Sequence, residues 1–451
     1  MTIKKKQNIK LWFVMIIALI FWSIGTGFNH DLSASSDETY KGLKLFSDVI
    51  ELVEKNYVDE VDTKKLIQKA VQGMVSSLDP HSALLPPEAF EELQIGTHGE
   101  FGGIGIVITM QKGVLTVISP IEGTPAYKAG IKAGDKIIKV DGELTRDMML
   151  WEAVKKMRGP KGEKVVITII RKGVLKPIDF ELIRDIIPII SVKSLVLQPG
   201  YGYIWITNFQ DNTTDNLKLA LAKLESGDVP LKGLVLDLRD NPGGLLNQSI
   251  SVTDLFLEKG KIVSIKGRLG KHTKIFRAHP NKIKRDYPIV VLINGGSASA
   301  SEIVAGALQD HKKAIIIGTT SFGKGSVQTV EALRDGYGLK FTIARYYTPN
   351  GRSIQAQGII PDIEVKQSVR DREEDDDGLI KEKDLRNHLE AEPNAKTGAK
   401  KDAGEKEDIR KKHKHPKVKS IHESLTLEGL LEDNQVMRAL DILRSYDILS
   451  S

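Results

Sequence analysis

The chain has 451 residues, with 65 basic and 59 acidic side chains, a formal net charge of +6 and a sequence pI near 9.0. This length allows two or three domains, and the mixed charges are weak evidence for nucleic acid, so we expect no such partner. The absence of cysteine excludes a thiol nucleophile, thiolate zinc sites and disulfides. The ten histidines show no paired metal-ligand spacing, so we expect neither a metal nor another cofactor.

The N-terminus has the pattern of an export segment. Four lysines within the first ten residues precede about 18 mostly apolar residues, Leu11 to Phe28. Such a run lies between a long signal peptide and a short membrane span, and no convincing small-residue cleavage site follows it. We interpret residues 1–36 as a signal peptide or membrane anchor, and favour an anchor at residues 11–28 in a bacterial inner membrane. The rest of the chain is then expected on the periplasmic or extracytoplasmic side.

Residues 37–96 are predicted to form a helical arm. A second helix of this arm ends at the motif LDPHS, residues 78–82, in which we interpret His81 as a turn residue without a catalytic role. Because two helices alone bury too little to be stable, we expect the arm to pack on another domain or on a second copy of the chain. Apolar residues at spacings of 3, 4, 3 and 4 mark one face of the first helix: Leu43, Phe46, Ile50, Val53 and Tyr57.

A glycine-rich loop opens the next segment, residues 97–185. Glycines let successive N–H groups point into one concavity, which can bind a chain-terminal carboxylate. Together with AGIKAGDKIIKVDG, residues 129–142, this loop resembles PDZ domains, and the resemblance implies a β-rich domain with two helices. Arg158 and Arg171 could pair across the domain boundary, but we favour solvated surface positions for both. The resemblance implies that the carboxylate is bound by Gly103, Ile104, Gly105 and Ile106.

Residues 186–366 alternate strand and helix patterns, which indicates an α/β core. A strand at 289–293 leads through a glycine turn into a serine cluster at the start of a predicted helix, where free N–H groups can face an oxyanion. A later strand ends in Gly323-Lys324-Gly325. A serine needs a base to become a nucleophile, and a lysine can serve if a dry pocket lowers its pKa. From spacing alone, a helix cap and a turn explain these residues equally well.

The segments SASASEI, residues 297–303, and FGKGSVQ, residues 322–328, resemble the carboxyl-terminal processing peptidases. These are serine-lysine proteases of family S41, which carry a PDZ domain. The resemblance implies that Ser299 is the nucleophile, that Lys324 is its general base and that Gln328 orients the lysine. It also implies a protein or peptide substrate with a free C-terminus, and dimers or higher homo-oligomers.

The motif LDLRDNPGG, residues 236–244, resembles a second signature of the same family. The family's oxyanion donors are backbone N–H groups, which fall here on Gly244 and Ala300. Glycine lets the backbone approach a scissile carbonyl closely, which suits this role. We interpret Asp237 and Arg239 as structural, as an ion pair or a loop brace.

Two alternatives compete with this dyad. Ser297 and Ser301 compete with Ser299 as nucleophile, but helix capping and packing explain them better. A Ser-His-Asp triad would need His311, which follows Ser299 by about three helical turns. At about 1.5 Å per residue the two side chains lie roughly 16 Å apart, too far for a proton shuttle.

The last part of the chain is predicted to be a tail. Residues 367–423 are rich in charge and poor in large apolar residues, which predicts a disordered linker. Within it, residues 380–389 have the pattern of a short helix. Residues 424–451 recover apolar residues at helical spacing, and we expect them to pack on the body of the chain or on a partner.

The predicted fold is a multidomain α+β chain with a helical arm, a PDZ domain, an α/β peptidase core and a helical C-terminal segment. We expect a serine endopeptidase that cleaves proteins whose C-terminus is engaged by the PDZ domain. We also expect homo-oligomers through the N- and C-terminal helices and contact with the membrane through the N-terminal segment. Two alternatives stay open: a membrane-tethered PDZ adaptor with an inert peptidase domain, and a protease that is inactive until an activating adaptor binds.

Overall fold

The computed structural model describes residues 31–111, 113–146, 148–369, 372–373, 380–390 and 425–450. Most of the predicted export segment, including the apolar run, and most of the predicted linker therefore lie outside the described residues. Within the ranges that are described, no helix combines the length and the apolar character that a membrane crossing requires. The chain divides into two compact units, residues 1–75 and 76–451.

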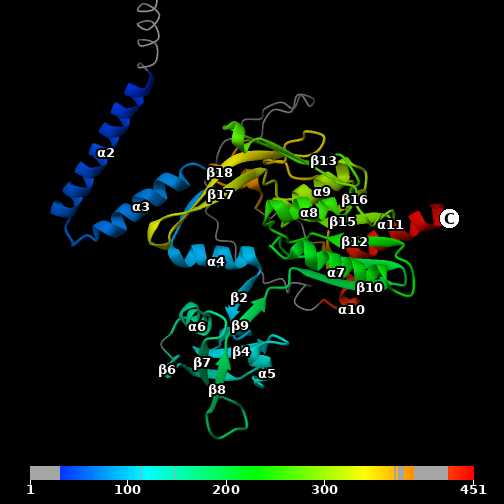
Figure 1. The fold of residues 1–451 in the computed structure, drawn as a ribbon, viewed down its shortest axis with the longest axis horizontal. Coiled ribbons are helices and arrows are strands. Elements are labelled where there is room, and N and C mark those ends of the chain that lie inside the picture. The colour runs from blue at the N-terminus through cyan, green and yellow to red at the C-terminus, as the bar shows by residue number, and fades with distance from the viewer. Residues whose placement is uncertain are drawn as a thin grey trace, which may run out of the picture. The chain divides into compact units, whose positions relative to one another are not determined.

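The first unit is helical, as the sequence predicts. It contains α2 (Asp31–Asn56) and nearly all of α3 (Thr63–Ser76) (Figure 1). The Asp62 carboxylate accepts the Lys65 N–H at 3.1 Å, which satisfies an amide at the start of α3. Four of the five residues of the apolar stripe lie on α2. Leu43 is 63 % and Phe46 40 % exposed in this single chain, whereas Ile50 and Val53 are partly buried.

The region that resembles a PDZ domain is a β-sheet with two helices. Its sheet has the order β3-β4-β5-β7-β8, with β6 paired to β5, and β2 and β9 form a separate antiparallel pair. Alternate residues of β7 (Val165, Ile167 and Ile169) are fully buried, because one face of the sheet covers the core. The elements are β2 (Glu100–Gly103), β3 (Ile106–Gln111), β4 (Val114–Pro120), α5 (Pro125–Lys128), β5 (Lys136–Val140), β6 (Glu143–Leu144), α6 (Leu150–Met157), β7 (Lys164–Ile170), β8 (Ile178–Ile183) and β9 (Asp185–Pro188).

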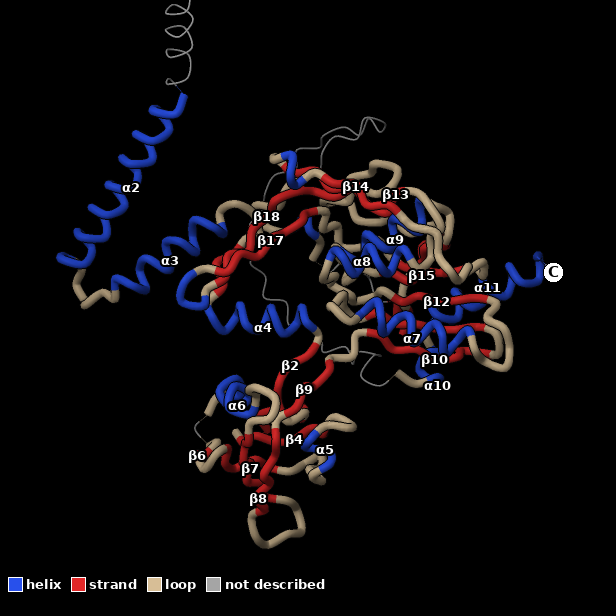
Figure 2. The backbone as a smooth tube through the Cα atoms, viewed as in Figure 1, coloured by secondary structure: helices blue, strands red, loops and turns tan. Residues whose placement is uncertain are grey.

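The peptidase core is built on a six-stranded sheet in the order β10-β11-β12-β15-β16-β19. Figure 2 draws strands in red and labels β10, β12 and β15 of this sheet. Its first two strands are antiparallel and the remaining neighbours are parallel. The strands are β10 (Val192–Gln198), β11 (Tyr201–Ile206), β12 (Gly233–Asp237), β15 (Ile289–Ile293), β16 (Ala314–Gly318) and β19 (Ile363–Glu364). The helices between them are α7 (Thr213–Glu225), α8 (Leu246–Asp254) and α9 (Ala300–Asp310).

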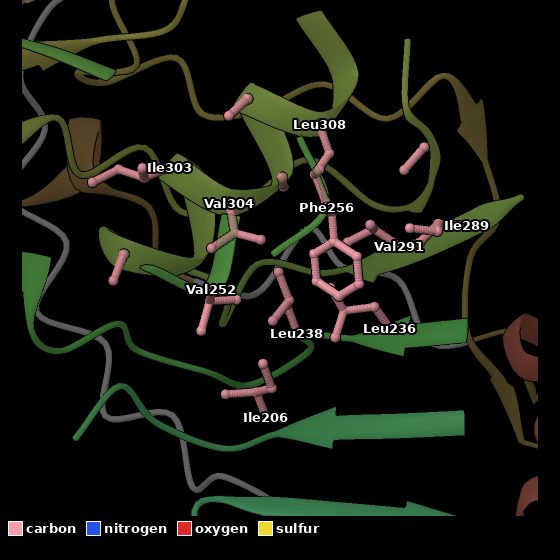
Figure 3. Close-up of a cluster of buried hydrophobic side chains, with 14 of the residues drawn as sticks. Ile206, Leu236, Leu238, Val252, Phe256, Ile289, Val291, Ile303, Val304 and Leu308 are labelled. Atoms are coloured by element: carbon pink, nitrogen blue, oxygen red, sulfur yellow. The ribbon is translucent and has the colours of Figure 1, made fainter. Parts of the chain in front are cut away.

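Both faces of this sheet are covered, which explains why its strands are apolar throughout. Alternation along β12 places Leu234 and Leu236 on the face covered by α7, α8 and α9, and Val235 on the other face. Figure 3 shows Leu236 near Phe256 and Val291, in the hydrophobic core on the face covered by α7, α8 and α9. The second face packs against α10 (Leu427–Glu432) and α11 (Asn434–Ser450), so the predicted C-terminal helices fold onto the chain's own body.

A second sheet, in the order β1-β18-β13-β14 with β17 paired to β18, carries residues that reach the site. Its strands are β1 (Ala83–Leu85), β13 (Lys261–Gly267), β14 (Lys274–Arg277), β17 (Ser326–Ala332) and β18 (Gly338–Tyr347). The smaller elements are α4 (Pro87–His98), η1 (Gly270–His272), η2 (Arg334–Gly336), η4 (Glu382–Asp384) and the short pair β20 (Ser368–Val369) and β21 (Arg372–Glu373). Residues 380–390, which fall within the predicted linker, thus contain a single 3-10 turn in place of the short helix expected there.

Candidate active site

Ser299 lies at the start of α9, after the turn that follows β15. Its backbone has φ 54° and ψ −110°, a conformation that residues other than glycine rarely adopt. The two competing serines hold this turn: Ser297 Oγ donates to Leu238 O at 2.7 Å, and Ser301 Oγ donates to Asn241 O at 2.9 Å. Both hydroxyls donate their hydrogen bonds to backbone carbonyls, which leaves Ser299 as the candidate nucleophile.

Glu302, in the first turn of α9, is a fully buried carboxylate. It links Ser299 to residues 319–325, the loop between β16 and β17 that carries Lys324 and that we call the lysine loop. Its Oε2 accepts the N–H groups of Ser299 at 2.7 Å and Lys324 at 3.0 Å. Its Oε1 accepts Ser321 Oγ at 2.5 Å and the Gly323 N–H at 2.8 Å. Burial raises the pKa of Glu302 to about 7, and the four hydrogen bonds oppose that shift because they favour the ionised form. One carboxylate thus holds the backbone of both candidate dyad residues.

Sequence reasoning assigned Glu302 no role, although a signal was present. Ser299 and Glu302 stand in the Ser-x-x-Glu pattern of a helix capping box, in which the glutamate reaches back to the N–H of the first residue. That pattern would have predicted the bond to Ser299. It contains nothing about the lysine loop, which lies about twenty residues further along the chain.

Tyr346 on β18 is a second link between the two residues that the sequence did not reveal. Its hydroxyl lies 3.1 Å from Ser299 O and within hydrogen-bonding distance of Lys324 O. Burial, together with the nearby Glu302 carboxylate, raises the pKa of Tyr346 well above its usual value, so the hydroxyl remains a donor. An aromatic residue in a strand is ordinary packing in most sequences, so the pattern carried no functional signal.

Lys324 lies in the loop between β16 and β17 and is mostly buried. Burial lowers the pKa of Lys324, and the positive charge of Lys340 on β18 lowers it further. A lysine general base needs such a lowered pKa, because only the neutral amine accepts a proton. Three carboxylates oppose the shift: Glu382, Glu302 and Asp79.

Gln328 on β17 lies near this loop but is not bonded to the lysine. Its Nε2 donates to Ser326 Oγ at 2.9 Å and to Thr342 Oγ1 at 3.3 Å. Among the side chains that the structure describes, no direct hydrogen bond joins Ser299, Lys324 and Gln328 to one another. Glu302 and Tyr346 hold the serine and the lysine through their backbones, whereas Gln328 has no such link.

Gly243 brings the backbone of the LDLRDNPGG motif against Ser299, and Gly244 lies against the backbone of Phe209. A Cβ on Gly243 would lie 2.8 Å from Ser299 Cβ and 3.0 Å from Ala300 N, so only glycine permits this approach. The Phe209 N–H donates to Gly243 O at 2.9 Å, which fixes the loop. Over the described ranges no acceptor takes the N–H of Gly244 or Ala300, so both can donate to a developing oxyanion.

Asp237 and Arg239 form the expected ion pair, at 2.5 Å, and both side chains are almost fully buried. The Tyr203 hydroxyl donates to Asp237 at 2.7 Å. Arg239 also donates to Asp433 and Gln435, each at 2.7 Å, which are in the C-terminal helical segment. This brace joins the strand before the glycine loop to the end of the chain.

The histidines do not form a triad. His311 Nε2 bonds to Lys261 O at 2.7 Å, and His81 Nε2 lies 2.7 Å from a carboxylate oxygen of Glu382. No histidine in the described part of the chain is hydrogen-bonded to Ser299. The same residues contain no group of three His, Cys, Asp or Glu side chains suited to a metal ion.

The predicted carboxylate loop connects β2 to β3. Gly105 has φ 76°, and a Cβ there would lie 2.3 Å from Thr124 Cβ, so the turn requires glycine. The carbonyls of Ile104 and Gly105 accept the N–H groups of Ala126 and Ile121, both at 2.9 Å. Within the described residues the N–H groups of Ile104 and Gly105 have no acceptor, which leaves donors at the place where a terminal carboxylate is expected.

The two arginines that were expected at the surface near the domain boundary, Arg158 and Arg171, have different partners. Arg158 forms an ion pair with Glu92 on α4 and lies over the Phe101 ring, 4.8 Å from its centroid. Arg171 bonds at 2.7 Å to Asp135 inside the PDZ-like region. Neither is a solvated surface arginine, so the interpretation favoured from the sequence was wrong for both.

Family comparisons agree with these features. The peptidase family S41 matches residues 200–365, the PDZ domain matches residues 116–171, and the activating protease CtpB N-terminal domain matches residues 26–88. A carboxy-terminal-processing protease of Bartonella bacilliformis is 48% identical over 368 residues, which cover 81% of this chain and 84% of that protein. The carboxy-terminal processing protease CtpA of Bacillus subtilis is 37% identical over 370 residues, 80% of this chain and 78% of that protein.

Among solved structures, the photosystem II D1 C-terminal processing protease is 33% identical, with a TM-score of 0.41, over 71% of this chain and 92% of that one. The sequence identity of the Bartonella protein over four fifths of the chain establishes the family. This protein is a serine peptidase, and it belongs to the carboxy-terminal processing proteases of family S41, which carry a PDZ domain.

Proposed function

We propose that Ser299 and Lys324 form the catalytic dyad of a serine endopeptidase whose substrates are engaged by their C-termini at the PDZ domain. The observation that carries the proposal is Glu302 Oε2, which accepts the backbone N–H groups of both residues and so brings the backbones of the nucleophile and the base to one buried atom. Further support comes from the lowered pKa of Lys324 and from the unbonded N–H groups of Gly244 and Ala300.

The reaction then proceeds by acyl transfer. Neutral Lys324 takes the hydroxyl proton as Ser299 Oγ attacks the scissile carbonyl, and the Gly244 and Ala300 N–H groups stabilise the oxyanion. The ammonium of Lys324 returns the proton to the leaving amine as the peptide bond breaks. Lys324 next deprotonates the water that hydrolyses the acyl-enzyme. Gln328 Oε1, which makes no hydrogen bond in the described residues, is the acceptor that would orient the lysine.

The surroundings of the enzyme are proposed from the sequence. Residues 11–28 anchor it in the inner membrane, and the catalytic part faces the periplasmic or extracytoplasmic side. The stripe on α2, with Leu43 63 % and Phe46 40 % exposed, supports assembly with a second copy, because exposed apolar side chains on one face of a helix favour burial against a partner. Gly103, Ile104, Gly105 and Ile106 bind the substrate carboxylate.

A digestion experiment tests the proposal. The full-length protein in detergent is incubated with an unstructured protein that ends in an apolar residue, either with a free carboxylate or with an amidated C-terminus, and the products are identified by mass spectrometry. We expect cleavage of the free-carboxylate form and little of the amide, because the PDZ loop offers N–H donors to a charge that the amide lacks. The Ser299→Ala variant should cleave neither.

Other outcomes separate the parts of the proposal. Equal cleavage of both substrates would keep the protease and remove the carboxylate-reading role of the loop. Binding of the free carboxylate without cleavage, even after addition of candidate adaptors, would favour the binding-protein alternative.

The rate should depend on pH through Lys324. Only the neutral amine is active, so kcat/KM rises with pH through the Lys324 pKa, in addition to any ionisation of Glu302 near pH 7. Lys340→Gln removes a positive charge that lowers the Lys324 pKa. The variant should therefore have a higher Lys324 pKa, a rising limb displaced to higher pH and a few-fold lower kcat/KM at neutral pH.

A pH series of kcat/KM on a quenched fluorogenic peptide measures this displacement. The matched control is Lys223→Gln, which makes the same charge change at an exposed position of α7. A limb that stays in place in Lys340→Gln, or that moves equally in the control, would contradict the role of Lys340.

A further inference from the structure

Residues 380–390, which we call the strap, lie against the loop that carries Lys324. Lys381 Nζ donates to Thr320 O at 2.8 Å, and the Glu382 N–H donates to Phe322 O at 3.2 Å. The strap therefore contacts two backbone carbonyls of this loop, although it was expected to be part of a disordered linker. These contacts place it beside the candidate general base.

Glu382 is the residue that the strap buries. Its side chain is 0 % exposed, and its carboxylate lies 2.7 and 2.9 Å from His81 Nε2. Gln355 Nε2 donates to Glu382 Oε1 at 2.9 Å. Burying a carboxylate is unfavourable unless hydrogen-bonding or charged partners compensate, so these partners form a built site for Glu382.

Gln355 transmits this contact to the lysine loop. The Gly325 N–H, immediately after Lys324, donates to Gln355 Oε1 at 2.9 Å. Gln355 Nε2 donates to two acceptors of the strap, Glu382 Oε1 and Leu389 O, the latter at 3.0 Å. A side-chain amide has one acceptor end and one donor end, so two acceptors at Nε2 turn Oε1 toward Gly325. The strap thus determines the orientation of the amide that holds the lysine loop.

His81 holds Glu382 from the other side and is itself anchored. Asp79 Oδ1 accepts the N–H groups of His81 at 2.8 Å and Ser82 at 2.9 Å. The Thr342 N–H donates to Ser82 Oγ at 3.3 Å, and Thr342 Oγ1 accepts from Gln328 at 3.3 Å. The LDPHS motif therefore has a definite function in the fold: it connects the strap to β18, whose Thr342 accepts a hydrogen bond from Gln328 of β17.

The lysine loop needs such a support because of its sequence. Lys324 stands between Gly323 and Gly325, and glycine has the greatest backbone freedom of any residue. The Gly323 and Lys324 N–H groups are held by Glu302 on one side of the lysine. The Gly325 N–H is held on the other side by Gln355 alone among the described residues.

We propose that Glu382 is a positioning residue for the proposed general base: through Gln355 it fixes the Gly323–Gly325 turn, so that the strap completes the active site. The proposal presupposes that Lys324 is the base. It adds that residues beyond the peptidase core, together with His81, are needed for the rate of the chemical step.

The experiment compares Glu382→Gln with Glu390→Gln in the full-length protein. Glu390 is exposed on the same strap, so the control makes the same chemical change without touching the buried site. A third variant, Gln355→Met, removes the link to Gly325 and keeps the Glu382 charge. For each we would measure the melting temperature, kcat, KM and the pH dependence of kcat/KM with the fluorogenic peptide.

We expect kcat of Glu382→Gln and Gln355→Met to fall by about 10- to 100-fold with KM little changed, because a misplaced base slows the chemistry without weakening substrate binding. The charged groups that face Lys324 are Lys340 on β18, Glu302 on α9, Asp79 before β1 and Glu382 itself. Loss of the Glu382 charge lowers the Lys324 pKa, so the rising limb should move to lower pH in Glu382→Gln and not in Gln355→Met. Glu390→Gln should match the parent protein.

Other results would overturn the proposal. A folded Glu382→Gln protein with unchanged kcat and pH profile would remove the positioning role, and a change in KM alone would assign the strap to substrate binding. If Glu382→Gln does not fold, Lys381→Met replaces it as the test, because this variant loses the bond from the strap to Thr320 O and keeps the buried carboxylate. An unchanged kcat in a folded Lys381→Met protein would contradict the proposal. A parent protein that stays inactive even after addition of candidate adaptors would reject the dyad, and the inference with it, whereas activity equal in parent and variants rejects the inference alone.

Discussion

Replacement of Ser299 by alanine is expected to lower kcat by roughly 10⁶-fold, as loss of the nucleophile does in other serine proteases. The fold should be retained, because the bonds that hold this turn come from the Ser299 backbone, through Glu302 and Tyr346. Lys324→Met should have a comparable effect. Cleavage of the fluorogenic peptide, followed beside the melting temperature, measures both.

Lys324→Arg sharpens this test. Arginine keeps a positive charge and a long side chain but cannot lose its proton in a protein, so it cannot act as a base. We expect Lys324→Arg to be as inactive as Lys324→Met. Activity in Lys324→Arg, or in a folded Ser299→Ala protein, would rule out the proposed dyad.

The largest effect on stability is expected from Arg239→Ala. Arg239 is 1 % exposed and is paired with Asp237 at 2.5 Å and Asp433 at 2.7 Å. Removing the guanidinium leaves two buried carboxylates without their cation, and breaking a buried pair in this way costs about 3–5 kcal/mol of unfolding free energy. Urea unfolding followed by fluorescence measures the loss.

The effect should extend to the C-terminal helices, because the hydrogen bond that Arg239 donates to Gln435, at 2.7 Å, ties α11 to the segment that follows β12. Faster proteolysis of residues 425–450 in the variant would report this release. Arg268→Ala, at an exposed position, is the matched control and should change stability little. A loss equal to that of the control would show that the buried brace contributes nothing to stability.

The sequence identified the candidate nucleophile and base because the local motifs that contain them resemble those of a known family, whereas their spacing alone was equally consistent with a helix cap and a turn. Ser299 stands at a strand-to-helix turn and Lys324 stands between two glycines, and each pattern has a local chemical meaning. Gly244 was recognisable for the same reason, since a glycine pair after a buried strand predicts a close approach of backbone. The stripe on α2 and the apolar strands of the central sheet were predictable from periodicity alone.

The partners of these residues were not predictable from local patterns. Tyr346 reaches Ser299 across 47 positions and Glu382 reaches His81 across 301 positions of sequence. A tyrosine in a strand and a glutamate in a charged segment each have an ordinary explanation, so neither pattern indicates a buried contact. The strap resembled a linker because its composition is polar, and composition cannot show that one carboxylate of the segment is buried and paired.

The amino-acid sequence by itself determined the helical arm, the PDZ-like region, the α/β core and the residues that resemble a serine-lysine dyad. Periodicity, turn residues and short motifs act within a few residues of one another, which is why they can be recognised in one dimension. Only the tertiary structure decided that Glu302 and Tyr346 hold the dyad and that Glu382 supports its base. Hydrogen bonds between distant segments depend on where packing places their atoms, and a buried charge is stable only where that packing supplies its partners.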